Sequence, residues 1–131
     1  MPYALRFYLY FFVASVVVVI AVWQAVLLAQ ERISPSEAKK YVGKSVTVCG
    51  KVASTAYASH AAGRPTFINL ERPYPNQPFN VVIWGSERSN FSPPPEKAYD
   101  GKKICVSGTV RVFREEPPRI VVTRPSQITV E

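Results

Sequence analysis

One pattern that occurs twice in the chain constrains its fold more than any other feature. It spans residues 40–52 and recurs at 98–110, each time as Tyr-x-Gly-Lys followed by alternating β-branched residues and a second glycine. Alternation with a period of two after a glycine turn indicates a β-strand. The second glycine, Gly50 or Gly108, lies on the apolar side, where a small barrel bends sharply and a side chain would obstruct the coiled strand. Two matched strands so far apart in sequence predict a closed barrel in which they are neighbours.

Residues 1–29 form a hydrophobic N-terminal segment. Residues 7–29 are apolar except for Ser15 and Gln24, and about 20 such residues are enough for a helix to span a bilayer. We expect an uncleaved membrane anchor, with the rest of the chain on the extracytoplasmic (periplasmic) side. The alternative is a signal peptide that is cleaved near Ala29 and releases the domain to the periplasm. A buried helix of a soluble domain is disfavoured, because the segment has almost no polar face.

The segment is followed by a linker with a short helix, predicted at residues 30–41, and by the folded domain, predicted at 42–131. Ser34, Pro35 and Glu37 form a capping-box pattern that starts the helix. Apart from Arg6, the chain has 15 basic and 9 acidic side chains, a net charge of +6. This balance favours anionic partners such as nucleic acid, anionic lipid or acidic glycan, and the plainer interpretation is a solvated basic surface.

The predicted fold class is all-β, a five-stranded barrel with an insert between the third and fourth strands. Proline-rich residues 71–78 separate the second strand from the third. The insert contains a helical turn near residues 87–91 and three consecutive prolines, a rigid polyproline spacer. The five strands are predicted at about residues 45–57, 66–70, 79–84, 102–114 and 119–123, and residues 128–130 extend an edge.

This order of elements resembles the oligonucleotide/oligosaccharide-binding (OB) fold. The resemblance covers about residues 33–131 and rests on the repeated Tyr-x-Gly-Lys unit, the strand Thr66–Leu70, and residues 120–122 followed by Pro125 and Ile128. It implies that the first and fourth strands are antiparallel. The whole chain is also similar to small exported bacterial proteins in which such a domain follows a hydrophobic segment. That similarity implies no particular activity, and the fold alone does not identify a ligand.

The sequence contains no recognisable catalytic or metal-binding constellation. His60, the single histidine, lies in a loop of small residues, and Asp100 belongs to a glycine turn. Two cysteines and one histidine cannot complete a four-ligand zinc site. Glu115 and Glu116 are adjacent in a turn rather than facing each other. We therefore expect that the protein is not an enzyme and that it needs no metal and no cofactor.

The outer face of the second and third strands is the expected ligand surface, as the resemblance implies. If the aliphatic residues of these strands face the core, two amides and two aromatic rings face outward, where a binder of single strands needs hydrogen bonding and stacking. The alternative is that Phe67 and Trp84 belong to the core. Arginines flank the face. The candidate ligand-binding residues are Arg64, Phe67, Asn69, Arg72, Asn80, Trp84, Arg111, Arg114 and Arg119.

Three functions are compatible with these features. The first is an exported, non-catalytic OB-fold module that binds an anionic polymer such as single-stranded nucleic acid, although nucleic acid is not routinely available outside the cytoplasm. The second is a protein–protein interaction domain that docks a membrane-protein partner. The third is a carrier similar to the haem chaperone of cytochrome c maturation. That family attaches haem through a histidine near its C-terminal end with tyrosine four residues later, whereas His60 is followed by Arg64 at that spacing.

Cys49 and Cys105 are predicted to form one disulfide. Both alternate with core valines, so both point away from the core of their strands. If the two strands are antiparallel neighbours, the thiols emerge on one face with Cβ atoms about 4.5–5.5 Å apart, near disulfide reach. Export would supply an oxidising compartment, and no cysteine is left over. The alternative is two inert, half-buried thiols.

Overall fold

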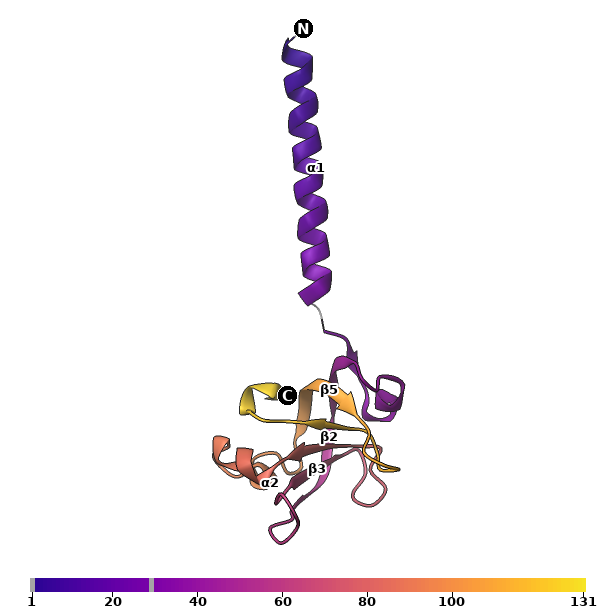
Figure 1. Cartoon of the computed structure of the whole chain (residues 1–131), viewed down its shortest axis with the longest axis vertical. Helices are drawn as coiled ribbons and strands as arrows, with labels where there is room; N and C mark the ends of the chain where they lie inside the picture. The colour runs from indigo at the N-terminus through magenta and orange to yellow at the C-terminus, as the bar shows by residue number, and fades with distance from the viewer. Residues whose placement is uncertain (1, 29) are drawn as a thin grey trace. The chain divides into compact units, whose positions relative to one another are not determined.

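The computed structural model describes residues 2–28 and 30–131, and the chain divides into two compact units between Gln30 and Glu31. The first unit contains helix α1 (Pro2–Leu28) (Figure 1). Its described large apolar side chains, among them Phe7 and Phe11, are exposed. None of the helices formed by residues 2–28 and 30–131 combines the length and apolarity needed to cross a membrane.

The second unit consists mainly of β-strands. Its elements in chain order are β1 (Arg32–Ile33), the 3₁₀ helix η1 (Pro35–Lys40), β2 (Ser45–Tyr57), β3 (Thr66–Leu70), β4 (Phe79–Ile83), the 3₁₀ helix η2 (Gly85–Asn90), the helical turn α2 (Pro95–Ala98), β5 (Lys103–Arg111), β6 (Arg119–Val121), the 3₁₀ helix η3 (Pro125–Gln127) and β7 (Ile128–Val130).

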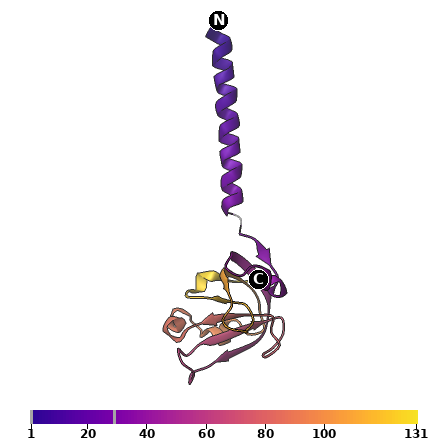
Figure 2. The same cartoon turned by 45° about the vertical axis from the view of Figure 1, so that its right-hand side comes forward.

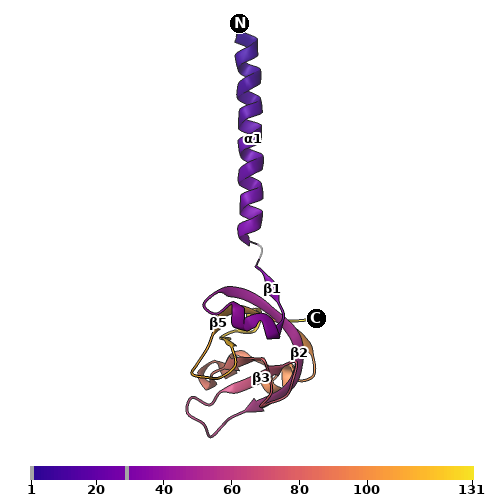
Figure 3. The ribbon, with the colours of Figure 1, turned by 90° about the vertical axis from the view of Figure 1, so that its right-hand side faces the viewer.

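Five of these strands form a closed barrel in the order β2–β3–β4–β6–β5, which closes where β5 pairs with β2. All neighbours in the barrel are antiparallel except β4 and β6, which are parallel. Two short strands extend the sheet, β1 parallel to β2 and β7 antiparallel to β5. The views in Figures 2 and 3 place the C-terminus beside β1, and Arg32 of β1 forms an ion pair with Glu131. The expected all-β barrel, with its first and fourth strands adjacent and antiparallel, is confirmed.

Two glycines let the long strands coil around the barrel. A Cβ on Gly50 would lie 2.7 Å from Pro35 Cγ, and one on Gly108 would lie 2.5 Å from Ile120 Cγ2. These separations are shorter than any ordinary carbon–carbon contact, so a side chain would displace η1 or β6. The prediction that both glycines occupy places with no room for a side chain is confirmed.

The core lies inside the barrel and is almost entirely aliphatic. Val46, Val48 and Val52 of β2 are buried, as the period-two pattern predicts. Phe91 and Tyr99, which directly follow η2 and α2 in the insert between β4 and β5, pack edge to face with ring centroids 6.4 Å apart. The largest fully buried side chains are Phe79, Ile68, Leu70, Ile83, Ile104, Ile120, Val48, Val52, Val81, Val82, Val106 and Val110.

Several strand ends differ from the sequence prediction. β4 ends at Ile83 instead of Trp84, because Trp84 is the N-cap of η2. β5 covers Lys103–Arg111 instead of residues 102–114. Arg114 has φ 56°, a left-handed conformation that interrupts an extended strand. β6 ends at Val121, two residues earlier than predicted. The bounds of β2, β3 and β7 agree with the prediction.

The region predicted as a linker packs against the barrel. Ser34 and Glu37 form the predicted capping box, although the helix that follows, Pro35–Lys40, is a 3₁₀ helix. Glu37 Oε1 accepts hydrogen bonds from the Ser34 backbone N at 3.3 Å and from Ser34 Oγ at 2.7 Å, and these bonds hold the pKa of Glu37 below its usual range. Ala38 of this helix is fully buried.

The insert between β4 and β5 is held to the barrel by Arg88. Its guanidinium binds both carboxylate oxygens of Glu96, at 2.6 Å each, and donates to Thr66 Oγ1 at 3.1 Å. It also stacks 3.6 Å from the centroid of the Tyr57 ring. One side chain therefore joins η2, α2, β2 and β3, and the predicted short helical insert is confirmed.

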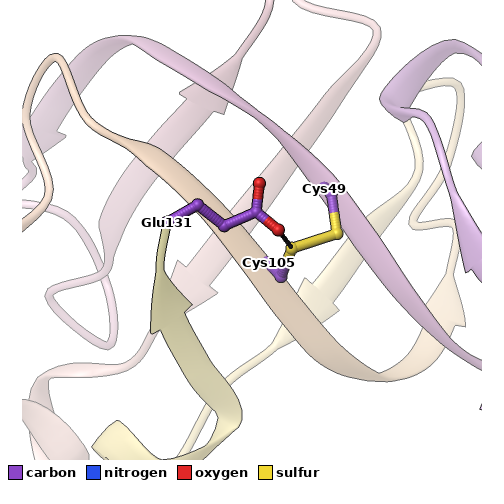
Figure 4. Close-up of side chains that lie close together, drawn as sticks. All are labelled: Cys49, Cys105 and Glu131. Atoms are coloured by element: carbon purple, nitrogen blue, oxygen red, sulfur yellow. Dashed lines mark hydrogen bonds between the residues drawn. A yellow bond between two sulfur atoms is a disulfide. The ribbon is translucent and has the colours of Figure 1, made fainter.

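The barrel is closed covalently as well as by backbone pairing. Cys49 of β2 and Cys105 of β5 are directly opposite each other and form the predicted disulfide (Figure 4). Glu131 Oε1 lies 3.0 Å from Cys105 Sγ. Arg32 Nη2 lies 3.0 Å from the same sulfur and 3.3 Å from Cys49 Sγ. The Arg32–Glu131 ion pair thus covers the bridge on its outer side.

Candidate functional site

The outer face of β2, β3, β4 and β6 carries a row of polar side chains. Ser54 is paired in register with Asn69, Asn69 with Asn80, and Asn80 with Arg119. Residues directly opposite each other in neighbouring strands point to the same face of the sheet. The next row on this face is apolar and consists of Ala56, Phe67, Val82 and Val121.

A cavity of about 600 Å³ opens over this face. Phe67, Asn69 and Asn80 line it, which confirms that these residues point away from the core. Two loops complete the wall, residues 71–78 between β3 and β4 and residues 112–118 between β5 and β6. The remaining lining residues are Ser54, Thr55, Ala56, Ala58, Pro73, Tyr74, Pro75, Gln77, Glu116 and Pro117.

Several polar atoms at the cavity are buried without a hydrogen-bond partner. Asn69 Nδ2 donates to Ser54 Oγ at 3.0 Å, but Asn69 Oδ1 has no partner. Asn80 Oδ1 and Gln77 Oε1 also have no hydrogen-bond partner. Asn69, Gln77 and Asn80 are each less than a tenth exposed. A buried polar group without a partner costs about 1–3 kcal/mol. These three oxygens are themselves buried, so a ligand in the cavity reaches them only if the amide groups turn.

Arg119, one of the arginines predicted to flank the face, belongs to the same polar row and is buried. It is 7% exposed, it forms an ion pair with Glu116, and its Nε has no partner. Its guanidinium carbon lies 5.6 Å from the centroid of the Phe113 ring, and that of Arg114 lies 5.1 Å from the same ring. The positive charge of Arg119 is therefore already paired by a carboxylate.

The other predicted arginines are exposed, and they surround the barrel at different places. Arg72 lies in the 71–78 loop and Arg114 in the 112–118 loop, so both are close in sequence to cavity-lining residues. Arg111 is opposite Arg119 in register and lines a second cavity, of about 410 Å³, with Gly108 and Gln127. None of these residues lines the 600 Å³ cavity.

Trp84 and Arg64 lie apart from that cavity. The Trp84 ring packs against the loop between β2 and β3, so that a Cβ on Gly63 would lie 3.0 Å from Trp84 Cε3. Trp84 remains 37% exposed and is therefore not a core residue. Arg64 contacts Gly85 in the same region, and His60 is exposed in the same loop. Of the predicted site residues, Phe67, Asn69 and Asn80 line the cavity, and the others lie outside it.

Sequence reasoning missed the residues that the loops contribute. Tyr74 and Gln77 come from the proline-rich 71–78 loop, and Tyr74 is 75% exposed. The available signal was the run of alternating prolines, which stiffens a loop and fixes an aromatic side chain within it. The sequence predicts Glu116 only as a turn residue, whereas the structure places it in the wall of the cavity.

One group of side chains has the composition of a metal site. Among the residues that the structure describes, ligand atoms of Cys49, Cys105 and Glu131 lie within 4.8 Å of one another. The sulfurs are bonded to each other, and it is the thiolate, not the disulfide, that binds metals. The Arg32 guanidinium also occupies this position. The group is therefore part of the barrel seam.

The closed barrel, with β2 adjacent to β5 and β4 parallel to β6, is an OB fold, and it is similar to parts of larger solved structures. An aspartyl-tRNA synthetase from Entamoeba histolytica matches with a TM-score of 0.52 and 16% identity, over 77% of this chain and 21% of that chain. A crystal structure described as an aspartyl-tRNA synthetase from Leishmania major Friedlin matches with a TM-score of 0.48 and 15% identity, over 79% of this chain and 21% of that chain. This chain thus matches about a fifth of each. No family model and no curated protein matches the sequence.

Proposed function

We propose that residues 31–131 form a non-catalytic module that binds single-stranded nucleic acid across the outer face of β3 and β4. The observation that carries this proposal is the cavity on that face, which is lined by the rings of Phe67 and Tyr74 together with the amide residues Asn69, Gln77 and Asn80. Hydrogen bonding and stacking to unpaired bases need this combination of groups.

Charge and fold also support nucleic acid as the partner. The chain has a net charge of +7 at pH 7, and exposed arginines adjoin both loops of the cavity. Exposed aromatic rings, Tyr74 at 75% and Phe113 at 53%, lie in the same loops. The Entamoeba histolytica protein that shares the fold is named as an aspartyl-tRNA synthetase. Cationic and aromatic side chains around a groove hold a single strand through its phosphates and its base faces.

The binding proposal is tested with the full chain in a mild detergent and a labelled single-stranded oligonucleotide, by fluorescence anisotropy. We expect a micromolar or weaker Kd that rises steeply with salt, because phosphate contacts release counterions. Phe67→Ala and Tyr74→Ala should each weaken binding by about 1–3 kcal/mol, the usual contribution of a stacked base.

Asn76→Ala provides the matched control for this experiment. Asn76 is an exposed residue of the same loop as Tyr74, but it does not line the cavity. Its removal should leave the Kd within about twofold of the unmodified protein, as for surface substitutions in general. Absence of binding even at low salt would contradict the proposal and favour the protein–protein interaction domain instead.

We also propose that this module acts outside the cytoplasm. The support is the Cys49–Cys105 disulfide, since such bridges persist in oxidising compartments, together with the apolar composition of residues 7–29. N-terminal sequencing and cell fractionation test this. An intact N-terminus in carbonate-resistant membranes would identify an anchor, and a new N-terminus near Gln30 in the periplasm would identify a signal peptide. Protein confined to the cytosol would refute export.

A further inference from the structure

The second cavity, of about 410 Å³, is lined by two arginines. Arg111 is the last residue of β5, and Arg124 directly precedes η3. The other described residues of the wall are Gly108, Thr109, Val121, Thr123 and Gln127, none of which is acidic. The 600 Å³ cavity, by contrast, is lined by the carboxylate of Glu116. The second cavity therefore carries charge of one sign, and such a cavity raises the local concentration of anions.

The charges of both arginines are available to a ligand. Within residues 2–28 and 30–131 the ion pairs join Arg32 to Glu131, Arg88 to Glu96 and Arg119 to Glu116. Arg111 and Arg124 belong to none of these pairs, and both residues are exposed. A guanidinium group presents its N–H donors in a planar fork that matches the oxygens of a phosphate group. The cavity therefore offers two such forks to one oxyanion.

Hydrogen bonds fix the backbone that carries Arg124. Gln127 Oε1 accepts hydrogen bonds from the Thr123 backbone N at 2.9 Å and from Thr123 Oγ1 at 3.1 Å. Gln127 Nε2 donates to the Ser107 carbonyl oxygen of β5 at 3.1 Å, and Asn90 Nδ2 donates to the Thr123 carbonyl oxygen at 2.8 Å. These bonds tie the wall of the cavity to β5 and η2. A wall that is already ordered loses less conformational freedom when a ligand binds.

The two cavities lie along one face of the sheet. The polar row that contains Asn69 and Asn80 continues from Arg119 to Arg111, which is opposite Arg119 in register and points to the same face. Because neighbouring strands lie about 4.8 Å apart, the path from β3 across β4 and β6 to β5 is about 14 Å along the sheet. Glu116 already neutralises Arg119, so Arg111 supplies the available charge of this row. A strand with a base at the first cavity can therefore place a phosphate at the second.

We propose that the second cavity is an oxyanion site that binds one backbone phosphate of the single strand. The inference rests on the proposed function. Arg111 and Arg124 donate N–H groups to the phosphate oxygens, and the hydroxyl group of Thr109, which lines the same cavity, is a further donor. Phosphate contacts fix the position of a strand but carry no sequence information. The site therefore orients the strand relative to the 600 Å³ cavity and selects no sequence.

The first test uses inorganic phosphate alone as the probe. The isotope-labelled full chain in detergent is titrated with phosphate in exchange for chloride at constant ionic strength, and backbone amide signals are followed by NMR. We expect saturable shifts for Thr109, Thr123 and Gln127, because these residues line the site. The Arg111→Gln/Arg124→Gln variant should show none of these shifts.

The second test measures how the Kd for an oligothymidylate depends on salt. Loss of one phosphate contact lowers the slope of log Kd against log salt concentration by about 0.7, and we expect this change for Arg111→Gln/Arg124→Gln. The matched control is Lys39→Gln/Lys40→Gln, which removes the same charge from exposed residues that line neither cavity. It should leave the slope unchanged. Arg111→Lys/Arg124→Lys keeps the charge and should keep the slope, while loss of the guanidinium forks raises the Kd.

A competition experiment determines whether the strand itself fills the site. At constant ionic strength, inorganic phosphate should weaken binding of the oligothymidylate to the unmodified protein, because both ligands occupy the same cavity. It should have no effect on the Arg111→Gln/Arg124→Gln variant. If phosphate saturates the site and leaves strand binding unchanged, the proposal is overturned, since the site then holds a free anion.

The outcomes separate this inference from the proposed function. Equal salt slopes for the unmodified protein and the glutamine variant, or phosphate shifts that do not saturate, would overturn the phosphate site while strand binding still supported the nucleic-acid module. Absence of strand binding to the unmodified protein would refute the proposed function and, with it, the claim that a strand supplies the phosphate. Circular dichroism verifies that each variant is folded. If the double glutamine variant is not, Arg124→Gln alone, outside the strands, takes its place.

Discussion

At the scale of single residues, two glycines determine whether the long strands can coil into a barrel. The position of a Cβ on Gly108 is only 2.5 Å from Ile120 Cγ2, inside the barrel where β5 passes β6. Gly108→Ala should therefore lower the free energy of unfolding by about 1–3 kcal/mol, the typical cost of an overpacked core. Chemical denaturation followed by circular dichroism measures this. The control is Lys103→Ala, on the exposed side of the same strand, which should change the free energy of unfolding by less than about 0.5 kcal/mol. An unchanged denaturation midpoint for Gly108→Ala would show that β6 moves to accommodate the added methyl group without a loss of stability.

Single residues also show which part of the site is predictable from sequence. Alternation in β3 and β4 leaves two registers open, because both sides of these strands are apolar, and the structure adopts the one in which Phe67, Asn69 and Asn80 point away from the core. It does not predict that the two asparagines are buried, because their burial depends on loops that fold over them. Trp84 follows the same alternation but leaves the face, since the chain turns into η2 at that residue.

At the scale of elements, strands with strong local signals are predictable and those made by tertiary pairing are not. The bounds of β2 follow from a glycine turn and a period of two. β1 has only two residues, Arg32 and Ile33, and exists because they pair in parallel with Thr47 and Val48. No local pattern distinguishes such a segment from a linker. The early end of β5 has a similar cause, because the left-handed Arg114 is imposed by the turn that leads to β6.

The insert between β4 and β5 depends on the Arg88–Glu96 pair, and this dependence predicts how stability responds to pH. Hydrogen bonds from Arg88 hold the pKa of Glu96 below its usual range. The stability that this carboxylate contributes is therefore fully present above its unfolded pKa, about 4.3, and is lost as the pH falls through the lower folded pKa.

Glu96→Gln removes this contribution. The variant should be less stable than the unmodified protein at pH 7, and the difference should shrink on acidification toward pH 2. Urea denaturation at several pH values measures both. Glu115→Gln, at an exposed turn, controls for the loss of a negative charge. A constant difference between Glu96→Gln and the unmodified protein at every pH would contradict the assignment.

At the scale of the whole molecule, the folded unit is a sheet that returns on itself, and its integrity depends on the seam between β2 and β5. Backbone pairing runs along the seam from Ser45 opposite Thr109 to Lys51 opposite Lys103, with the Cys49–Cys105 bridge within it. Short barrels bury little apolar area for their size, so a covalent link across the seam adds substantially to their stability. The repeated sequence pattern predicts this seam, because each of its two strands follows a glycine turn of the same kind, at Gly43 and at Gly101.

Opening the bridge should therefore destabilise the barrel without abolishing its fold. The disulfide joins positions that are 56 apart in the sequence, and the chain-entropy estimate for a loop of that size is about 4 kcal/mol. We expect a reductant to lower the free energy of unfolding by up to that amount, because the unfolded chain regains the freedom that the loop removes. Backbone pairing along the seam should keep the reduced protein folded, with its circular dichroism spectrum preserved.

The Cys49→Ser/Cys105→Ser variant separates the bridge from other effects of the reductant. Its stability should equal that of the reduced protein and should not respond to reductant. Thiol counting completes the measurement: protein denatured without reductant should present no alkylatable thiol, and two after reduction. Two thiols before reduction would show that the cysteines are free in the isolated protein. If the serine variant had the same free energy of unfolding as the oxidised protein, the bridge would contribute nothing to stability. Backbone pairing and core packing alone would then hold the seam.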